Sequence, residues 1–307
     1  MRLLRFAVAL IALAAGADEG WAYGIDAEAS APPKARGDEI RLAQIVPETA
    51  KPEATTGNPS LAPLKWVGML VVPNPTQANP KQITECTAQF IAPSVLLTAA
   101  HCVKDIIDNQ AGPWPDPTKG TFWLQYQNQQ GTPYKIRCAA PNPLWTLPAN
   151  YASMSPAEKN GAQRTAFQHD FAMILVDGVS TTGVMPYELD WKGTVLYVVR
   201  VGYAGDILDG QIVQESGGPV FFADAIPMLP KSYPNIVVQW APITDLTEGT
   251  SGGAWIANFN TVENPNKNLL VAVTSFSFDA YPGGEGAAYL TAAEFNPLLD
   301  FVSRGCQ

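Results

Sequence analysis

The segment Leu96-Leu97-Thr98-Ala99-Ala100-His101-Cys102 carries a histidine directly after an apolar run of strand length. Small residues separate this run from the histidine, and a cysteine follows it. The chain has 307 residues but only two histidines, His101 and His169. If the chain uses a histidine as a base, only these two residues can serve. The function then depends on which carboxylate and which nucleophile lie near that histidine.

Two serines with glycine neighbours are candidate nucleophiles. They lie in Glu248-Gly249-Thr250-Ser251-Gly252-Gly253-Ala254-Trp255 and in Glu215-Ser216-Gly217-Gly218-Pro219. Glycine lets the backbone turn sharply and approach a ligand closely. The first turn can also aim the N–H groups of Gly249 and Ser251 at one point, as stabilisation of an oxyanion requires. Such a motif also occurs in ordinary loops, so its meaning depends on a base and an orienting carboxylate.

Three motifs resemble one enzyme family, the chymotrypsin-like (trypsin-like) serine proteases. Thr98-Ala99-Ala100-His101-Cys102 is similar to the histidine motif of the family, and Cys86-Thr87-Ala88-Gln89-Phe90-Ile91 resembles the strand before it. His169-Asp170-Phe171, followed by an apolar run to residue 176, is similar to the aspartate motif. The resemblance covers residues 66 to 306. It implies an all-β fold of two six-stranded antiparallel β-barrels with a C-terminal helix.

The resemblance also implies a Ser-His-Asp triad. His101 would be the base and Asp170 the carboxylate that orients it. Neighbouring side chains of an extended chain point to opposite faces, so we expect a structural role for His169. Ser216 follows Asp170 by only 46 residues, whereas Ser251 follows it by 81, which leaves room for most of a second barrel. We therefore predict Ser251 as the nucleophile and place Ser216 in a hairpin or bulge.

Residues around Ser251 resemble the bacterial secreted branch of the family. Thr250 stands where the animal digestive enzymes have an aspartate that pairs with a newly cut N-terminus, so we expect that activation switch to be absent. Asp245 lies where the trypsin branch has the carboxylate that binds Arg or Lys, although an aspartate can also cap a loop. Ser275-Phe276-Ser277 resembles the substrate-lining strand, with core packing of Phe276 as the alternative.

Four cysteines in an exported chain suggest two disulfides, for which three pairings exist. The resemblance implies a bridge from Cys86 to Cys102, which leaves Cys138 to pair with Cys306, with two free thiols as the alternative. The chain has no Cys-x-x-Cys and no His-Glu-x-x-His motif. We therefore expect no metal and no cofactor.

The N-terminus predicts export. Residues 1–22 have the basic start and short apolar run of a signal peptide. Residues 23–64 are rich in Ala, Pro, Glu and Gly and indicate a disordered leader or propeptide. The peptidase domain is expected from residue 65 to 307, with the N-terminal barrel at about 65–185 and the C-terminal barrel and helix at about 186–307. A secreted or periplasmic location follows.

Composition limits the partners. The hydrophobic content of 47% is enough for a substantial core, and a net charge of −9 argues against nucleic-acid binding. No later stretch reaches the length of a membrane anchor. The resemblance and its triad imply a secreted serine endopeptidase that acts on protein or peptide substrates through an acyl-enzyme, and we expect a monomer. The alternative is a catalytically inactive protease homologue that acts as a binding protein.

Short apolar runs between turn residues predict the strands. They cover residues 65–72, 86–92, 95–98, 121–127, 134–138, 171–176, 195–201, 211–214, 236–240, 254–259, 269–276 and 287–291. One helix is predicted at the C-terminus, with Asn296 as its cap and Pro297 at its first position.

Overall fold

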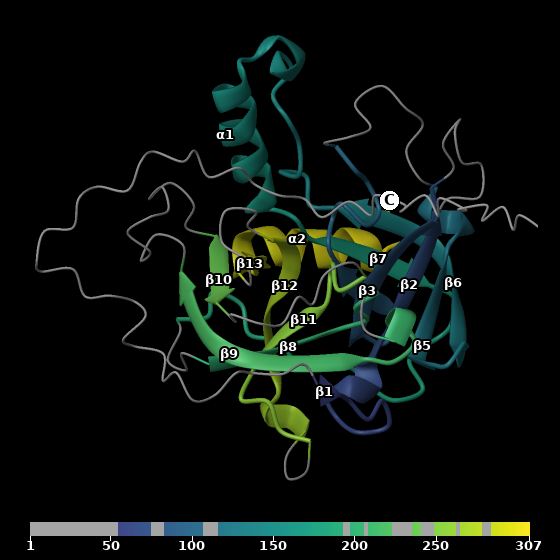
Figure 1. The fold of residues 1–307 in the computed structure, drawn as a ribbon. Helices are drawn as coiled ribbons and strands as arrows, with labels where there is room; N and C mark the ends of the chain where they lie inside the picture. The colour runs from purple at the N-terminus through teal and green to yellow at the C-terminus, as the bar shows by residue number, and fades with distance from the viewer. Residues whose placement is uncertain are drawn as a thin grey trace, which may run out of the picture.

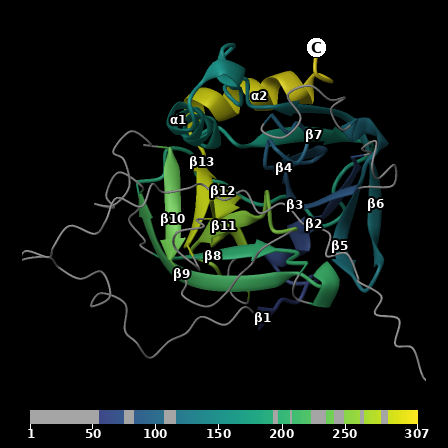
Figure 2. The ribbon, with the colours of Figure 1, turned by 45° about the horizontal axis from the view of Figure 1, so that its top comes forward.

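The computed structural model describes residues 55–74, 83–106, 116–192, 197–205, 208–222, 235–240, 249–261, 265–277 and 284–307. Within these ranges, strands form two antiparallel barrels that lie side by side (Figures 1 and 2). Each barrel has six strands, and a helix near the C-terminus packs across both. The predicted all-β architecture of two barrels with a C-terminal helix is confirmed.

The first barrel closes in the order β2-β3-β4-β7-β6-β5. Rings of Phe90, Phe122 and Tyr134 pack edge to face in its interior, with Phe90 lying 5.5 Å from Phe122 and 5.1 Å from Tyr134 between ring centroids. The bounds are β2 (Val67–Pro73), β3 (Ile83–Ala92), β4 (Val95–Thr98), β5 (Thr121–Gln127), β6 (Gln130–Pro141) and β7 (Ala172–Val176).

The second barrel runs β9-β10-β13-β12-β11-β8 and closes because β8 also pairs with β9. A short strand, β1 (Thr55–Thr56), extends this sheet beside β9. Residues 55–64, which precede the expected start of the peptidase domain, are therefore part of the folded chain, and Leu64 among them is fully buried. The bounds are β8 (Tyr197–Gly202), β9 (Gln214–Phe222), β10 (Ile236–Trp240), β11 (Ala254–Ala257), β12 (Leu269–Ser277) and β13 (Gly284–Tyr289).

The predicted strand at residues 211–214 is misplaced, because β9 begins at Gln214 and continues through both glycines after Ser216. Ser216 therefore lies in a regular strand and not in a hairpin or bulge. A Cβ at Gly217 would overlap the ring of Tyr197 on the neighbouring strand β8, and one at Gly218 would press on the side chain of Gln239. These glycines permit close packing and do not mark a turn.

Two α-helices accompany the barrels. The C-terminal helix α2 (Ala292–Ser303) begins four residues before the predicted cap, so that Pro297 lies inside it. Burial of Phe295, Leu298 and Val302 against both barrels holds the helix despite the proline. The Cys138–Cys306 disulfide, a predicted pair, joins β6 to the chain just after α2. No helix within the described ranges is long and apolar enough to cross a membrane.

Helix α1 (Pro156–Phe167) was not predicted and stands out from the barrels in Figure 1. Its start is nevertheless encoded locally, since the Ser155 side chain accepts from the Glu158 N–H and Glu158 accepts from the Ser155 N–H. The short 3₁₀ helices are η2 (Leu64–Trp66), η3 (Pro117–Lys119), η4 (Tyr151–Ser153), η5 (Leu208–Gly210) and η7 (Pro265–Lys267).

A charged pair lies inside the second barrel. Arg200 of β8 is 1% exposed, and its guanidinium contacts the carboxylate of Glu285 on β13. Trp255 pairs with Arg200 on the adjacent strand and is also buried. Removal of one charge would leave the other without compensation in a low-dielectric interior.

Replacement of Arg200 by methionine is expected to lower the free energy of unfolding by about 3–5 kcal/mol, because the Glu285 carboxylate stays buried without its cation. Denaturant unfolding measures the change. The double variant Arg200→Met/Glu285→Leu should recover most of the loss. Arg304→Met removes an exposed pair with Asp300 and should cost less than about 1 kcal/mol. Equal stability of the Arg200 and Arg304 variants would contradict the prediction.

Candidate active site

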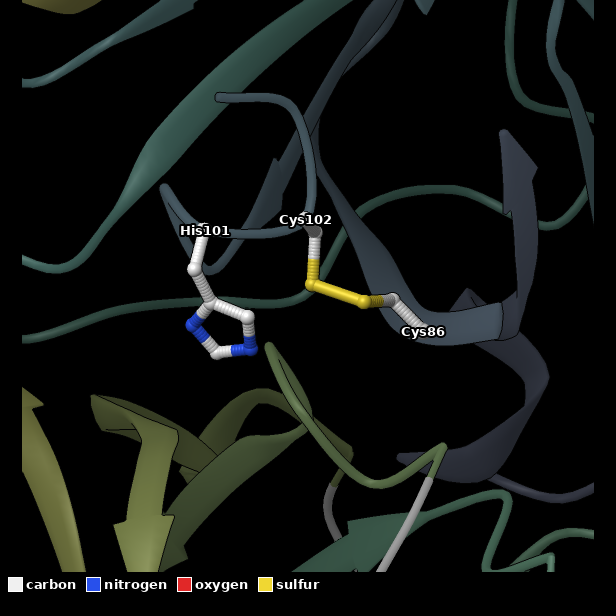
Figure 3. A group of neighbouring side chains, drawn as sticks. All are labelled: Cys86, His101 and Cys102. Carbon is white, nitrogen blue, oxygen red and sulfur yellow. A yellow bond between two sulfur atoms is a disulfide. The ribbon is translucent and has the colours of Figure 1, made fainter. Parts of the chain in front are cut away.

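His101 lies in the turn that follows β4. The N–H groups of Val103 and Lys104 both donate to the carbonyl of Ala100, which closes this turn. The next residue, Cys102, forms the predicted disulfide with Cys86 of β3. Figure 3 shows the imidazole beside this disulfide and directed toward a loop of the second barrel. The side chain is largely buried, at 8% residue exposure.

Asp170 lies two residues before the start of β7 and is fully buried. Strands β4 and β7 are antiparallel neighbours with Thr98 opposite Ala172, so the end of β4 meets the start of β7. The His101 backbone N–H donates to Asp170 Oδ1 at 2.9 Å, and its Nδ1 lies 2.7 Å from Oδ2. One contact therefore holds the backbone of His101 and the other holds its imidazole against the same carboxylate, as an orienting aspartate requires.

The charges around His101 set its basicity. Burial lowers the pKa of His101, but the charge and hydrogen bond of Asp170, together with the charge of Asp105, raise that pKa above its ordinary value. The imidazole is therefore a stronger base than a free histidine. Asp105 was not predicted from the sequence, where an acidic residue four positions after a histidine carries no specific signal.

Ser251 follows a sharp turn at the start of β11. Gly249 and Gly252 have φ angles of +86° and +80°, which favour glycine. Ser251 is partly exposed, and its carbonyl oxygen accepts from the N–H of Thr87 at 2.8 Å. The same oxygen lies 3.8 Å from Cys102 Sγ. The fold thus brings Ser251 beside the segment that carries His101, although 150 residues separate them.

Ser216 is not in this neighbourhood. It is 1% exposed in the middle of the second sheet, where it lies opposite Arg200. A serine buried among strands cannot present its hydroxyl to a substrate.

His169 contacts a different carboxylate. Its Nδ1 lies 2.9 Å from Glu294 Oε2 on α2, and Asn142 Nδ2 donates to the same oxygen at 2.5 Å. Burial raises the pKa of Glu294, but the hydrogen bonds from His169 and Asn142 hold that pKa below its ordinary value. The His169 side chain therefore turns away from Asp170, although the two residues are adjacent.

The structure places the candidate pocket residues in different surroundings. Ser275 donates its hydroxyl to Asp170 Oδ2 at 2.5 Å. Phe276 is 5% exposed and lies 5.0 Å from Phe167 between ring centroids, so it belongs to a core. Ser277 is partly exposed at the end of β12. Asp245 lies outside the described residues.

His101, Cys86 and Cys102 also come within 4.8 Å of one another through atoms that often bind metals. The two sulfur atoms are joined in a disulfide and are not thiolates. This trio therefore cannot hold a metal ion while the bridge is intact.

Two six-stranded antiparallel barrels with a C-terminal helix define the chymotrypsin-like fold, the fold of a class of serine proteases. Comparisons with protein-family models and with curated protein sequences find no match. Solved structures do match, at sequence identities that show the fold alone.

Three similar structures illustrate the match. The protease Anisep from Arthrobacter nicotinovorans is 13% identical, with a TM-score of 0.59 over 82% of this chain and 100% of that one. A Glu endopeptidase is 19% identical, with a TM-score of 0.55 over 83% of this chain and 97% of that one. Human heparin binding protein is 16% identical, with a TM-score of 0.53 over 82% of this chain and 96% of that one.

Proposed function

We propose that the protein is a serine endopeptidase with Ser251 as nucleophile, His101 as base and Asp170 as orienting carboxylate. The observation that carries the proposal is the two-point contact of Asp170 with His101, at 2.9 Å and 2.7 Å. This contact holds Nδ1–H toward the carboxylate and leaves Nε2 to accept a proton. The similar solved structures that are proteases of the same fold support the assignment.

The reaction would proceed by acyl transfer. His101 Nε2 removes the proton of the Ser251 hydroxyl as Oγ attacks the peptide carbonyl, and it then gives that proton to the leaving amine. The N–H groups of Gly249 and Ser251 stabilise the oxyanion. A water molecule, activated by the same imidazole, releases the acyl group from Ser251. No metal or organic cofactor takes part in this scheme.

Substrate would bind as an added strand along β12. Among the strands that the structure describes, Phe276 and Ser277 pair only with β13. The other edge of β12 pairs with β11, but only through residues 269–273, so β11 does not cover that edge at Phe276 and Ser277. An extended peptide can hydrogen-bond to such an edge. Ser275 at its start contacts Asp170, so a peptide there would lie beside the proposed triad.

The preferred P1 residue is tested with Arg, Phe, Ala and Glu chromogenic peptides. If Asp245 lies at the base of the pocket, the arginine peptide should be cleaved best, because a carboxylate pairs well with a guanidinium. Cleavage confined to apolar P1 residues would assign Asp245 to loop capping instead.

Export is part of the proposal. Both disulfides join residues of the peptidase domain, and such bridges persist in oxidising compartments outside the cytoplasm. The predicted signal peptide lies outside the described residues. N-terminal sequencing of the protein from the culture medium and from the periplasm would locate both the protein and its mature end.

The alternative function is binding without catalysis. One similar structure is named a heparin binding protein, so this fold does not by itself establish an enzyme. A net charge of −9 opposes the binding of an anionic polysaccharide such as heparin. Labelling with a fluorophosphonate probe decides between the two, since only an activated serine reacts. Absence of label on the native protein would favour the binding function.

Asp105→Asn is expected to shift the acid limb of the kcat/KM profile to lower pH. The Asp105 charge raises the pKa of His101, so its removal lets the imidazole lose its proton at lower pH and act as a base there. Asp177→Asn, which alters an exposed aspartate paired with Arg137, serves as the control and should leave the limb unchanged. An Asp105 variant with the native profile would show that this charge does not act on the base.

A further inference from the structure

Strand β3 of the first barrel contacts the nucleophile loop of the second. We define this loop as residues 249–253. The contacts come from Thr87 and Gln89, which lie one and three residues after the disulfide cysteine Cys86 and are fully buried. Neither side chain can reach a bound substrate. Their polar atoms face the loop, so their effect on the site must pass through its backbone.

Thr87 binds the loop at two places. Its hydroxyl donates to the Gly249 carbonyl at 2.7 Å and accepts from the Tyr203 N–H at 3.0 Å. Its backbone N–H donates to the Ser251 carbonyl at 2.8 Å. One residue of the first barrel therefore holds the carbonyls of both Gly249 and Ser251, on either side of the Thr250–Ser251 peptide.

Gln89 binds the next carbonyl. Its Nε2 donates to the Gly252 carbonyl at 3.1 Å and to the Leu97 carbonyl of β4 at 3.0 Å. The amide thereby joins the loop to the strand that leads into His101. Thr98, the last residue of β4, donates its hydroxyl to the Thr87 carbonyl at 2.8 Å and holds β3 in place.

The remaining loop peptides are fixed from within the second barrel. The Gly253 N–H donates to the Thr250 carbonyl at 2.8 Å, and the Thr274 N–H donates to the Gly253 carbonyl at 2.9 Å. Every carbonyl from Gly249 to Gly253 thus has a partner. The Thr250 carbonyl and the Ser251 N–H belong to one planar trans peptide and point in opposite directions. A hydrogen bond that holds this carbonyl therefore also sets the direction of the Ser251 N–H.

Stability alone does not explain Gln89. Among the residues that the structure describes, its Oε1 atom has no hydrogen-bond partner although the side chain is fully buried. Burial of an unpaired amide oxygen is unfavourable, and an apolar side chain of similar size would avoid that cost. The contact of Nε2 with the Gly252 carbonyl gives a reason for an amide at this position.

We infer that Thr87 and Gln89 are positioning residues for Ser251, because they hold the carbonyls of Gly249, Ser251 and Gly252 around it. The inference rests on the proposed peptidase function. Through Cys86, the same stretch of β3 is also bonded to Cys102, the neighbour of His101. A single strand segment of the first barrel is therefore bonded both to the nucleophile loop and to the neighbour of the base.

Thr87→Val tests the inference because it keeps the shape of the side chain and removes both hydroxyl contacts. We expect kcat to fall about 10- to 100-fold with an unchanged KM, since a small displacement of reacting groups has an effect of this size. Thr87→Ser restores the hydroxyl and should recover most of kcat. Thr84→Val is the control, because Thr84 lies on the same strand and, within the described residues, its hydroxyl accepts a hydrogen bond only from Asn74.

The rates are normalised to the sites that a fluorophosphonate titrates, and they are measured well below the melting temperature of each variant. A lower melting temperature with native kcat per titrated site would show that Thr87 is only a structural residue and would overturn the inference. The expected result also includes an unchanged pH limb, because the Thr87 hydroxyl binds Gly249 and Tyr203 and leaves the contact of His101 with Asp170 in place.

A second variant, Gln89→Met, removes the contact with Gly252 independently and should lower kcat in the same way. Amide hydrogen exchange of residues 249–253 gives a readout that does not require activity. Exchange should be faster in Thr87→Val and Gln89→Met than in Thr84→Val. Native exchange in both would refute the inference, whereas faster exchange in a protein that no fluorophosphonate labels would refute the peptidase function alone.

Discussion

Replacement of Ser251 by alanine is expected to lower kcat by about 10⁶-fold while the protein stays folded. The hydroxyl is the proposed nucleophile, and without it no acyl-enzyme can form. The substitution leaves the backbone contact between the Ser251 carbonyl and Thr87 in place, so the loop should keep its conformation. Hydrolysis of a chromogenic peptide measures the loss, and circular dichroism with thermal unfolding checks the fold.

Ser216→Ala is the matched control, because Ser216 is the other serine followed by two glycines. It lies buried in β9, so kcat per folded molecule should stay at the native value. Fluorophosphonate labelling should be lost in the Ser251 variant and kept in the Ser216 variant. Near-native turnover by Ser251→Ala would remove this residue as the nucleophile.

Asp170→Asn is expected to lower kcat by about 10⁴-fold. The asparagine can keep its Oδ1 toward the His101 backbone N–H, but its Nδ2–H₂ group then faces His101 Nδ1. This ring nitrogen would have to accept a hydrogen bond, which places the proton on Nε2 and leaves no base toward Ser251. The pKa of His101 should also fall, since the largest favourable charge on the imidazole is removed.

Two measurements separate this effect from a general loss of structure. Asp105→Asn removes another negative charge that acts on the same histidine but keeps the hydrogen bond of Asp170 to Nδ1, so its kcat should change far less than that of Asp170→Asn. Circular dichroism of the Asp170 variant should show the native fold, while fluorophosphonate labelling should fall together with kcat. Equal kcat for both variants would show that Asp170 does not orient the base.

Much of the fold could be predicted from local patterns. The runs at residues 95–98, 121–127 and 236–240 coincide with β4, β5 and β10, because apolar residues between turn residues mark buried strands. The start of α2 was predicted too late, since Pro297 is typical of a first helical turn. In the folded chain, burial of Phe295 on the core side outweighs that preference.

The site could be predicted only where its residues lie in motifs. His101 and Asp170 were identified by their neighbours, and their contact is confirmed by two short distances. Thr87 and Gln89 carry no such signal, because threonine and glutamine are ordinary residues of a strand. Asp105 is likewise an unremarkable acidic residue in the sequence.

The sequence by itself determined the class of the fold, the strands with clear boundaries and the motifs that carry His101 and Asp170. These features depend on local burial patterns and short motifs, which a linear chain displays directly. Tertiary structure alone decided that Ser216 is buried in a strand, that Arg200 meets Glu285, and that Thr87 meets Gly249 across 162 residues. Contacts of this kind arise from the closure and packing of two barrels, and no local pattern of residues encodes them.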